Sequence, residues 1–182
     1  MPVPLLLAMA EVELRESDRT RIDSFRIDHD PQHILVPAHV TFVFPHPPLD
    51  EAAARTHIAA IAGRTPPLDF VLRDAAAVPD PLHPGATHLY LLPAEGEAAM
   101  RALHAALYSG PLAAALRRDI PFQPHLTIGA FSEIDAARQA AESWTREGLA
   151  IAGRIAALSV CRFDGRALER LESCPLTGLP AA

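Results

Sequence analysis

Two short segments of the chain each place a histidine and a threonine two residues apart. The first reads VPAHVTFVFP and contains His39 and Thr41; the second reads PFQPHLTIGAF and contains His125 and Thr127. An imidazole exchanges protons near neutral pH, and a hydroxyl donates hydrogen bonds to phosphate oxygens. Two such pairs around one small space could perform acid–base chemistry on a phosphate ester without a metal ion. We therefore predict that the two histidines are catalytic and that the two threonines bind phosphate.

Both segments have the alternation of a β-strand with one apolar face. Residues i and i+2 of a strand point to the same side, so His39 lies beside Thr41, and His125 lies beside Thr127 and Gly129. The intervening residues are apolar and can pack against helices. A single histidine in an apolar strand is commonly a core residue with one satisfied nitrogen. Two copies in matching contexts instead favour a paired site.

The elements around the two segments follow one another in the same order twice: strand, helix, His-x-Thr strand, helix, strand. The histidines are 125 − 39 = 86 residues apart, close to half of the 182-residue chain. Asp50 is expected to cap a helix that ends at Gly63, and Ser132 with Asp135 to form a capping box. We expect strands at 4–12, 33–44, 67–78, 87–92, 121–131, 151–163 and 167–176, and helices at 17–30, 50–64, 95–110 and 132–148.

This layout predicts an α+β fold with two pseudo-symmetric lobes. Each lobe would be an antiparallel sheet with helices on its outer face, and a cleft would separate the lobes. The lobes would span about residues 1–80 and 86–182 of a single bilobal domain, 1–182, and strands could exchange between them. The Pro- and Gly-rich stretch VPDPLHPGA marks the boundary.

The C-terminal strands predict that the two cysteines are unpaired. Asp164-Gly165 is a typical two-residue hairpin turn, which pairs residues whose numbers sum to 163 + 166 = 329. Cys161 would then face Leu168, and Cys174 would face Ile155, so no disulfide is expected.

Charge and hydropathy restrict the partners of the protein. The net charge of −6 argues against duplex DNA, which requires a basic surface. No apolar stretch approaches the length of a membrane span. The N-terminal MPVPLLLAMAEVEL turns acidic without a basic leader, which indicates a first strand and not a signal peptide. We expect a cytoplasmic protein, monomeric and without membrane partners.

Other residues are weaker candidates for substrate contacts. His88 and Tyr90 share one face of THLYLL, where the tyrosine could stack on a base or contact a phosphate, although an ordinary half-exposed pair is an equal alternative. Arg162 could supply positive charge. His104 is expected on or near the surface of its helix, and Trp144 is expected to anchor its helix to the core.

At the two His-x-Thr segments the chain resembles the two-histidine (2H) phosphoesterase superfamily, which includes the 2′-5′ RNA ligase-like proteins and cyclic phosphodiesterases. The tetrads HVTF and HLTI match its pattern. The resemblance implies a bilobal fold and metal-independent attack on a 2′,3′-cyclic phosphate or a 2′-5′ linkage of a nucleotide or RNA end, with no cofactor. By this resemblance His39 and His125 are the acid–base pair, and Thr41 and Thr127 bind the phosphate.

Two alternatives remain at this point. The same cleft could retain a phosphorylated nucleotide or RNA end without turnover, as a binding module. A metal-dependent hydrolase that uses His39 and His125 as ligands is disfavoured, because neither tetrad contains a carboxylate and threonine is a poor third ligand.

Overall fold

The computed structural model describes residues 4–48, 50–81 and 83–179; residues 1–3, 49, 82 and 180–182 lie outside the description. Nine strands, four α-helices and two short 3₁₀ helices are formed by these residues. In chain order they are β1 (Leu5–Glu11), β2 (Glu13–Leu14), α1 (Glu16–His29), η1 (Pro31–Ile34), β3 (His39–His46), α2 (Glu51–Arg64), β4 (Leu68–Pro79), β5 (Thr87–Glu95), α3 (Glu97–Leu107), η2 (Gly110–Ala115), β6 (Leu126–Phe131), α4 (Ile134–Arg146), β7 (Ile151–Ile155), β8 (Ala157–Phe163) and β9 (Leu168–Pro175).

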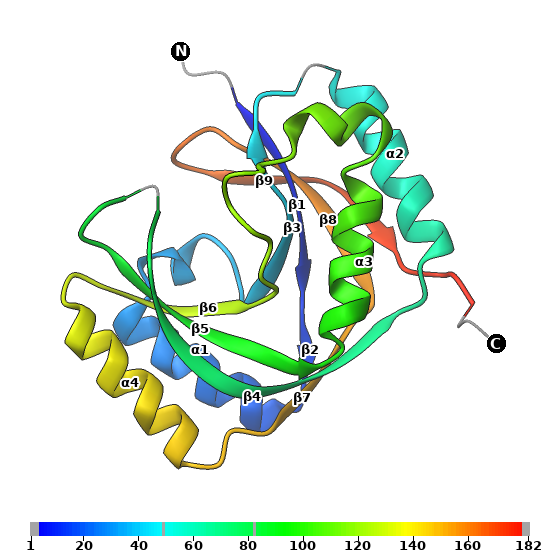
Figure 1. Ribbon diagram of the computed structural model, residues 1–182. Coiled ribbons are helices and arrows are strands. Elements are labelled where there is room, and N and C mark those ends of the chain that lie inside the picture. Colours follow the sequence, from blue (N-terminus) through cyan, green and yellow to red (C-terminus); the bar gives the residue numbers. More distant parts are fainter. Residues whose placement is uncertain (1–3, 49, 82, 180–182) are drawn as a thin grey trace.

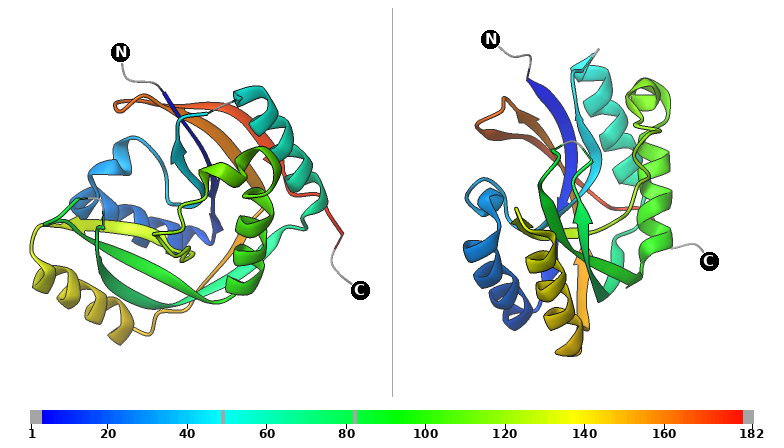
Figure 2. Two further views of the ribbon diagram at one scale, coloured as in Figure 1. Left: turned by 45° about the horizontal axis from the view of Figure 1, so that its top comes forward. Right: turned by 60° about the vertical axis from the view of Figure 1, so that its left-hand side comes forward.

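The strands form two antiparallel sheets, and each sheet has its own pair of helices. The first sheet has the order β3-β1-β8-β9, and the second has the order β2-β7-β4-β5-β6. Helices α2 and α3 pack on the first sheet, whereas α1 and α4 pack on the second (Figure 1). The two helix pairs lie on opposite sides of the molecule (Figure 2). The α+β architecture with two sheets and outer helices is confirmed.

The two sheets are not formed by continuous halves of the chain. Strand β4 belongs to the second sheet, where it pairs with β5 and β7, and the C-terminal strands β8 and β9 belong to the first. Helix α1 covers the second sheet and α3 covers the first. The predicted boundary includes residue 82, which lies outside the described residues; on either side of it β4 and β5 pair as a hairpin within one sheet, so the lobes are not divided there. The two lobes each contain strands from both halves of the sequence.

Three predicted strands are wrong in their extent. The strand expected at 121–131 begins only at Leu126, so His125 directly precedes β6. The strand expected at 33–44 begins only at His39, because Pro31 opens the 3₁₀ helix η1 and a loop follows it. The strand expected at 151–163 is two strands, separated at Ala156. Ile155 pairs with Leu68 in the second sheet, whereas Ala157 pairs with Pro175 in the first. The chain crosses between sheets here, and strand periodicity alone does not reveal such a crossing.

The predicted register of the last hairpin is also wrong. The turn comprises residues 164–167, and the Asp164 carboxylate accepts the backbone N–H groups of Arg166 and Ala167. This side-chain capping favours a longer turn than Asp-Gly alone. Phe163 faces Leu168, and an irregularity after Val160 places Cys161 opposite Arg170. Both cysteines are buried and free.

Of the two helix N-caps predicted from the sequence, one is formed and the other is not. Asp50 caps α2 by accepting the N–H of Ala53, as expected, although the helix continues through Gly63 to Arg64. The capping box of Ser132 is absent, because α4 begins one residue later with Glu133 at the N-cap.

Candidate active site

The two His-x-Thr segments meet because each lies at an edge strand: His39 is the first residue of β3, and His125 directly precedes β6. Strand β3 is the outer strand of the first sheet, β6 is the outer strand of the second, and the two edges contact each other near the centre of the molecule (Figure 1). On β3, Val40 and Phe42 are buried against the helices; on β6, Leu126 and Ile128 are buried in the same way. Burial of these apolar residues turns the intervening polar residues toward the opposite sheet.

The alternation on β6 is interrupted after Thr127. Tyr90 pairs with Thr127 but Leu89 pairs with Gly129, so Ile128 is an extra residue in this strand. Gly129 consequently faces the α1 side, where a Cβ would lie close to Phe131 and His29. The prediction that Gly129 shares the face of His125 is therefore wrong, and the bulge is the reason.

The two histidines have matching hydrogen bonds. Nδ1 of His39 lies 3.0 Å from the Pro37 carbonyl oxygen, and Nδ1 of His125 lies 2.6 Å from that of Gln123. A carbonyl can only accept, so each ring is a donor at Nδ1. Each Nε2 is therefore left to accept or donate a proton toward a ligand. Both rings are held in the tautomer that acid–base catalysis at Nε2 requires.

The pKa values of both histidines are lower than the ordinary value for histidine. Burial lowers the pKa of His125 to about 4; the positive charges of His39 and His88 add to this effect, while the hydrogen bond to Gln123 opposes it. Burial also lowers the pKa of His39, and the nearby Arg26 acts in the same direction. The effect of the His39 charge on the pKa of His125 shows that the two rings lie close enough to interact electrostatically.

The two threonines lie on the faces that the histidines occupy. Thr41 pairs with Met9 on β1, and Thr127 pairs with Tyr90 on β5. Both side chains are half-buried. Within the described part of the chain, neither hydroxyl has a hydrogen-bond partner, so both can donate to a ligand oxygen.

Tyr90 and His88 form a short ring stack behind His125. The Tyr90 ring lies 3.6 Å from the His125 ring at an angle of 19°, and the His88 ring lies 5.9 Å from Tyr90 at 5°. Nε2 of His88 lies 3.0 Å from an oxygen of Asp80. The structure thus brings both predicted residues next to a catalytic candidate, although Tyr90 packs face to face on the histidine itself.

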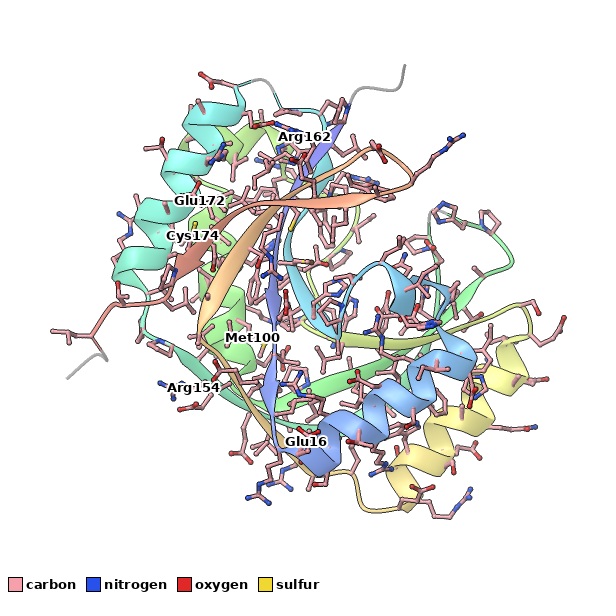
Figure 3. All side chains as sticks on the ribbon, turned by 180° about the vertical axis from the view of Figure 1, so that it is seen from behind. Glu16, Met100, Arg154, Arg162, Glu172 and Cys174 are labelled. Carbon is pink, nitrogen blue, oxygen red and sulfur yellow. The ribbon has the colours of Figure 1, made fainter. Side chains whose placement is uncertain are left out.

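Arg162 lies away from this cluster. It pairs with Leu6 on β1, whose side chain points into the core on the helix side of the first sheet. Its guanidinium bonds Glu51 of α2 at 2.8 Å and Glu169 at 3.0 Å. Figure 3 shows Arg162 near the start of α2. The prediction that it contacts substrate is not supported by this geometry.

A different arginine lies on the correct face of the sheet. Arg170 of β9 pairs with Cys161, which packs with Met9 on the face of Thr41, and its guanidinium forms an ion pair with Glu11. Glu11 is directly opposite His39 in the β1–β3 ladder. Sequence reasoning missed this residue because its position depends on the order in which β3, β1, β8 and β9 assemble.

Comparison with known proteins agrees with this arrangement. The sequence profile described as the 2′-5′ RNA ligase superfamily matches residues 14–167. The chain belongs to the 2′-5′ RNA ligase superfamily. It is accordingly a two-histidine phosphoesterase enzyme. A comparison with curated proteins found no significant match.

Solved structures share the fold of this superfamily member at low sequence identity. The protein TT0787 of Thermus thermophilus is 16% identical, with a TM-score of 0.62 over 97% of this chain and 100% of its own. Usb1 of Kluyveromyces marxianus is 12% identical, with a TM-score of 0.61 over 96% and 99%. LigT of E. coli, solved with 3′-AMP, is 16% identical, with a TM-score of 0.56 over 96% and 99%.

One histidine of this superfamily member is more buried than the sequence predicted. His104 of α3, expected near the surface, is buried and lies between the two His-x-Thr segments. Its Nδ1 lies 2.9 Å from the Phe42 carbonyl oxygen, and its ring stacks on Phe122 at 3.8 Å. Phe122 precedes Gln123, whose carbonyl oxygen accepts the hydrogen bond from Nδ1 of His125. The amphipathic pattern of the helix contained a signal, since His104 follows Met100 and Leu103 at helical spacing.

The described residues offer no obvious metal centre. Among them, no three His, Cys, Asp or Glu side chains are grouped so that they could hold a metal ion. No helix in the described part of the chain is long and apolar enough to cross a membrane.

Trp144 is buried and packs edge-on against Phe25, which agrees with its predicted role as an anchor of α4.

Proposed function

We propose that the protein is a metal-independent phosphodiesterase that opens a 2′,3′-cyclic phosphate or cleaves a 2′-5′ phosphodiester in a nucleotide or RNA end. The observation that carries this proposal is the matched pair of imidazoles. Each donates Nδ1–H to a backbone carbonyl, each lies at the edge of a different sheet, and the positive charge of His39 lowers the pKa of His125. This is the arrangement that a two-sided proton transfer requires.

In the proposed reaction one neutral Nε2 removes a proton from the attacking water. The water oxygen forms a new bond to phosphorus while the bond from phosphorus to a ribose oxygen breaks. The second, protonated histidine donates its proton to that leaving oxygen. Thr41 and Thr127 donate hydrogen bonds to the non-bridging oxygens, whose negative charge grows during the attack.

A nucleotide-sized substrate agrees with the charge distribution. The chain is acidic overall, and many of its arginines, including Arg55, Arg154 and Arg162, pair with carboxylates. A long RNA strand would require a continuous track of free cations along its backbone. Among the neighbouring structures, LigT was solved with 3′-AMP and Usb1 with uridine monophosphate, which are ligands of this size.

The test is turnover of a nucleoside 2′,3′-cyclic phosphate in the presence of a chelator. We expect chelator-resistant hydrolysis, and we expect kcat to fall roughly 100- to 10,000-fold in both His39→Ala and His125→Ala, because each loses an acid or a base. The exposed His83→Ala variant is the matched control and should retain full activity. Binding without turnover in the wild type, or loss of turnover in chelator, would contradict the proposal.

A further inference from the structure

An apolar cavity opens next to His39 and Thr41. Its volume is about 150 Å³, and it lies between β1, the loop after η1 and the β8–β9 hairpin. Its apolar wall includes Leu7, Met9, Leu35, Phe163 and Leu168. The cavity therefore begins at the proposed phosphate site and extends along the inner face of the first sheet.

The lining of this cavity excludes charged ligand groups. Within the described part of the chain, its polar side chains are His39, Thr41 and Gln32, and none of its lining residues is an arginine or a carboxylate. A second phosphate or a carboxylate would lose its hydration there without an arginine to pair with it. An uncharged ring, in contrast, gains from the burial of its apolar faces. The Gln32 amide adds one group that can hydrogen-bond to the polar edge of a ring.

The size of the cavity fits one aromatic ring. An apolar protein cavity of about 150 Å³ takes up a molecule such as benzene. This cavity is partly open, so a larger ring system can project from it. Because His39 and Thr41 line both the cavity and the phosphate site, a group in the cavity lies close enough to be joined to the reacting phosphate through one sugar.

The alternative place for a base is the Tyr90 ring, and it is already covered. One face of this ring lies against His125 at 3.6 Å, and His88 stacks beside it. A base stacking directly on that face would have to displace the catalytic candidate. The cavity beside His39 requires no such displacement.

We propose that this cavity binds the nucleobase of the nucleotide whose phosphate lies between the two histidines. The proposal rests on the proposed phosphodiesterase function and adds the position at which the base binds. It predicts that the enzyme acts on nucleotides in preference to sugar phosphates without a base.

The experiment compares two substrates with the wild type and two variants. The substrates are adenosine 2′,3′-cyclic phosphate and the methyl riboside 2′,3′-cyclic phosphate, which has no base. The variants are Leu35→Asn, which makes the cavity wall polar, and Ile34→Asn, a control on the neighbouring residue outside the cavity. Both side chains are already exposed, Leu35 at 41% and Ile34 at 76%, so both variants should fold.

We expect the kcat/KM of the wild type to be about tenfold or more higher for the nucleotide than for the methyl riboside. Loss of apolar contacts in a binding pocket lowers kcat/KM by a factor of this order. Leu35→Asn should reduce this preference several-fold, mainly through KM, and Ile34→Asn should leave it unchanged. Equal use of both substrates by the wild type, or an unchanged preference in Leu35→Asn, would overturn the proposal.

Failure of the proposed function would give a different result, because neither substrate would then be turned over. The cavity is tested independently in that case by equilibrium binding of adenosine 3′-monophosphate and of methyl riboside 3′-phosphate. Tighter binding of the nucleotide that is weakened in Leu35→Asn but not in Ile34→Asn supports the base site. Equal affinity for the two compounds rejects it.

Discussion

At the scale of single residues, the imidazole environment decides when the enzyme can work. A backbone carbonyl fixes the tautomer of each ring, and burial lowers the pKa of His39 and lowers that of His125 to about 4. The proposed reaction requires one neutral and one protonated histidine. In the free enzyme, one ring is protonated and the other neutral only at a pH below the ordinary pKa of histidine. At higher pH both rings are neutral.

We therefore predict that kcat/KM is highest at mildly acidic pH and falls as the pH rises above about 6.5. The pH dependence of kcat should be displaced to higher pH, because a bound phosphate anion favours the protonated form of a nearby histidine. Initial rates across pH 4.5 to 8.5, measured at low and at saturating substrate, separate the two profiles. A kcat/KM that still rises between pH 7 and pH 8.5 would contradict the assignment.

At the scale of elements, α3 connects the two His-x-Thr segments. His104 donates from Nδ1 to the Phe42 carbonyl of β3 and stacks on Phe122, just before the residue that holds His125. On the same helix side, the Tyr108 hydroxyl accepts the backbone N–H of Phe44. The relative position of the two edge strands therefore depends on a cluster of rings between α3, β3 and the loop before β6.

Replacement of this ring should affect both stability and turnover. We expect His104→Ala to lower the free energy of unfolding by roughly 2–4 kcal/mol, because it creates a cavity and leaves a buried carbonyl without its donor. His104→Asn keeps a donor near the position of Nδ1 and should recover part of the loss. Denaturant unfolding and kcat measured below the transition test this prediction. His83→Ala, on an exposed loop, serves as control, and equal stability of all three variants would argue against the role of His104.

At the scale of the whole molecule, exchange of strands joins the two lobes into one unit. The main hydrophobic core contains residues of both sheets and of all four helices. Neither sheet can form without strands from both halves of the chain, because β4 crosses to the second sheet and β8 with β9 return to the first. We infer that the lobes unfold together, as a single cooperative domain.

This cooperativity makes acid stability a property of the whole protein. The pKa values of His39, His104 and His125 are lower in the folded chain than the ordinary value of 6.5. Between pH 6.5 and about 4 the unfolded chain binds more protons, so stability falls as the pH decreases through this range. Each histidine contributes up to about 1.4 kcal/mol per pH unit where its unfolded form is protonated and its folded form is neutral.

We predict a lower free energy of unfolding at pH 5 than at pH 7.5, measured by denaturant titration at constant ionic strength. This window lies above the ordinary carboxylate range, which limits the contribution of acidic groups. The double variant His39→Gln/His125→Gln should show a smaller decrease, since two of the titrating rings are absent. Equal stability of the wild type at both pH values would show that these rings remain accessible to protons in the folded state.

Local patterns predicted much of the site. Periodicity identified the strands of both His-x-Thr segments, and alternation correctly placed His39 beside Thr41 on a polar face. The same reasoning failed where a local irregularity intervened, as at Gly129 and at the turn after Phe163. The prediction for Arg162 was wrong, and Arg170 was not identified. Strand alternation tells which residues share a face, but it does not tell which strands are neighbours in the sheet.

The sequence by itself determined the residue types, the two-fold repetition of the layout and the polar side of each His-x-Thr strand. These properties depend on neighbours within a few residues, and strand or helix periodicity expresses them directly. Only the tertiary structure decided that β3 and β6 are facing edge strands, that His104 is buried between them and that the cavity near Leu35 adjoins His39. Those features arise from pairing between segments far apart in the chain, where burial of the shared core outweighs local preference.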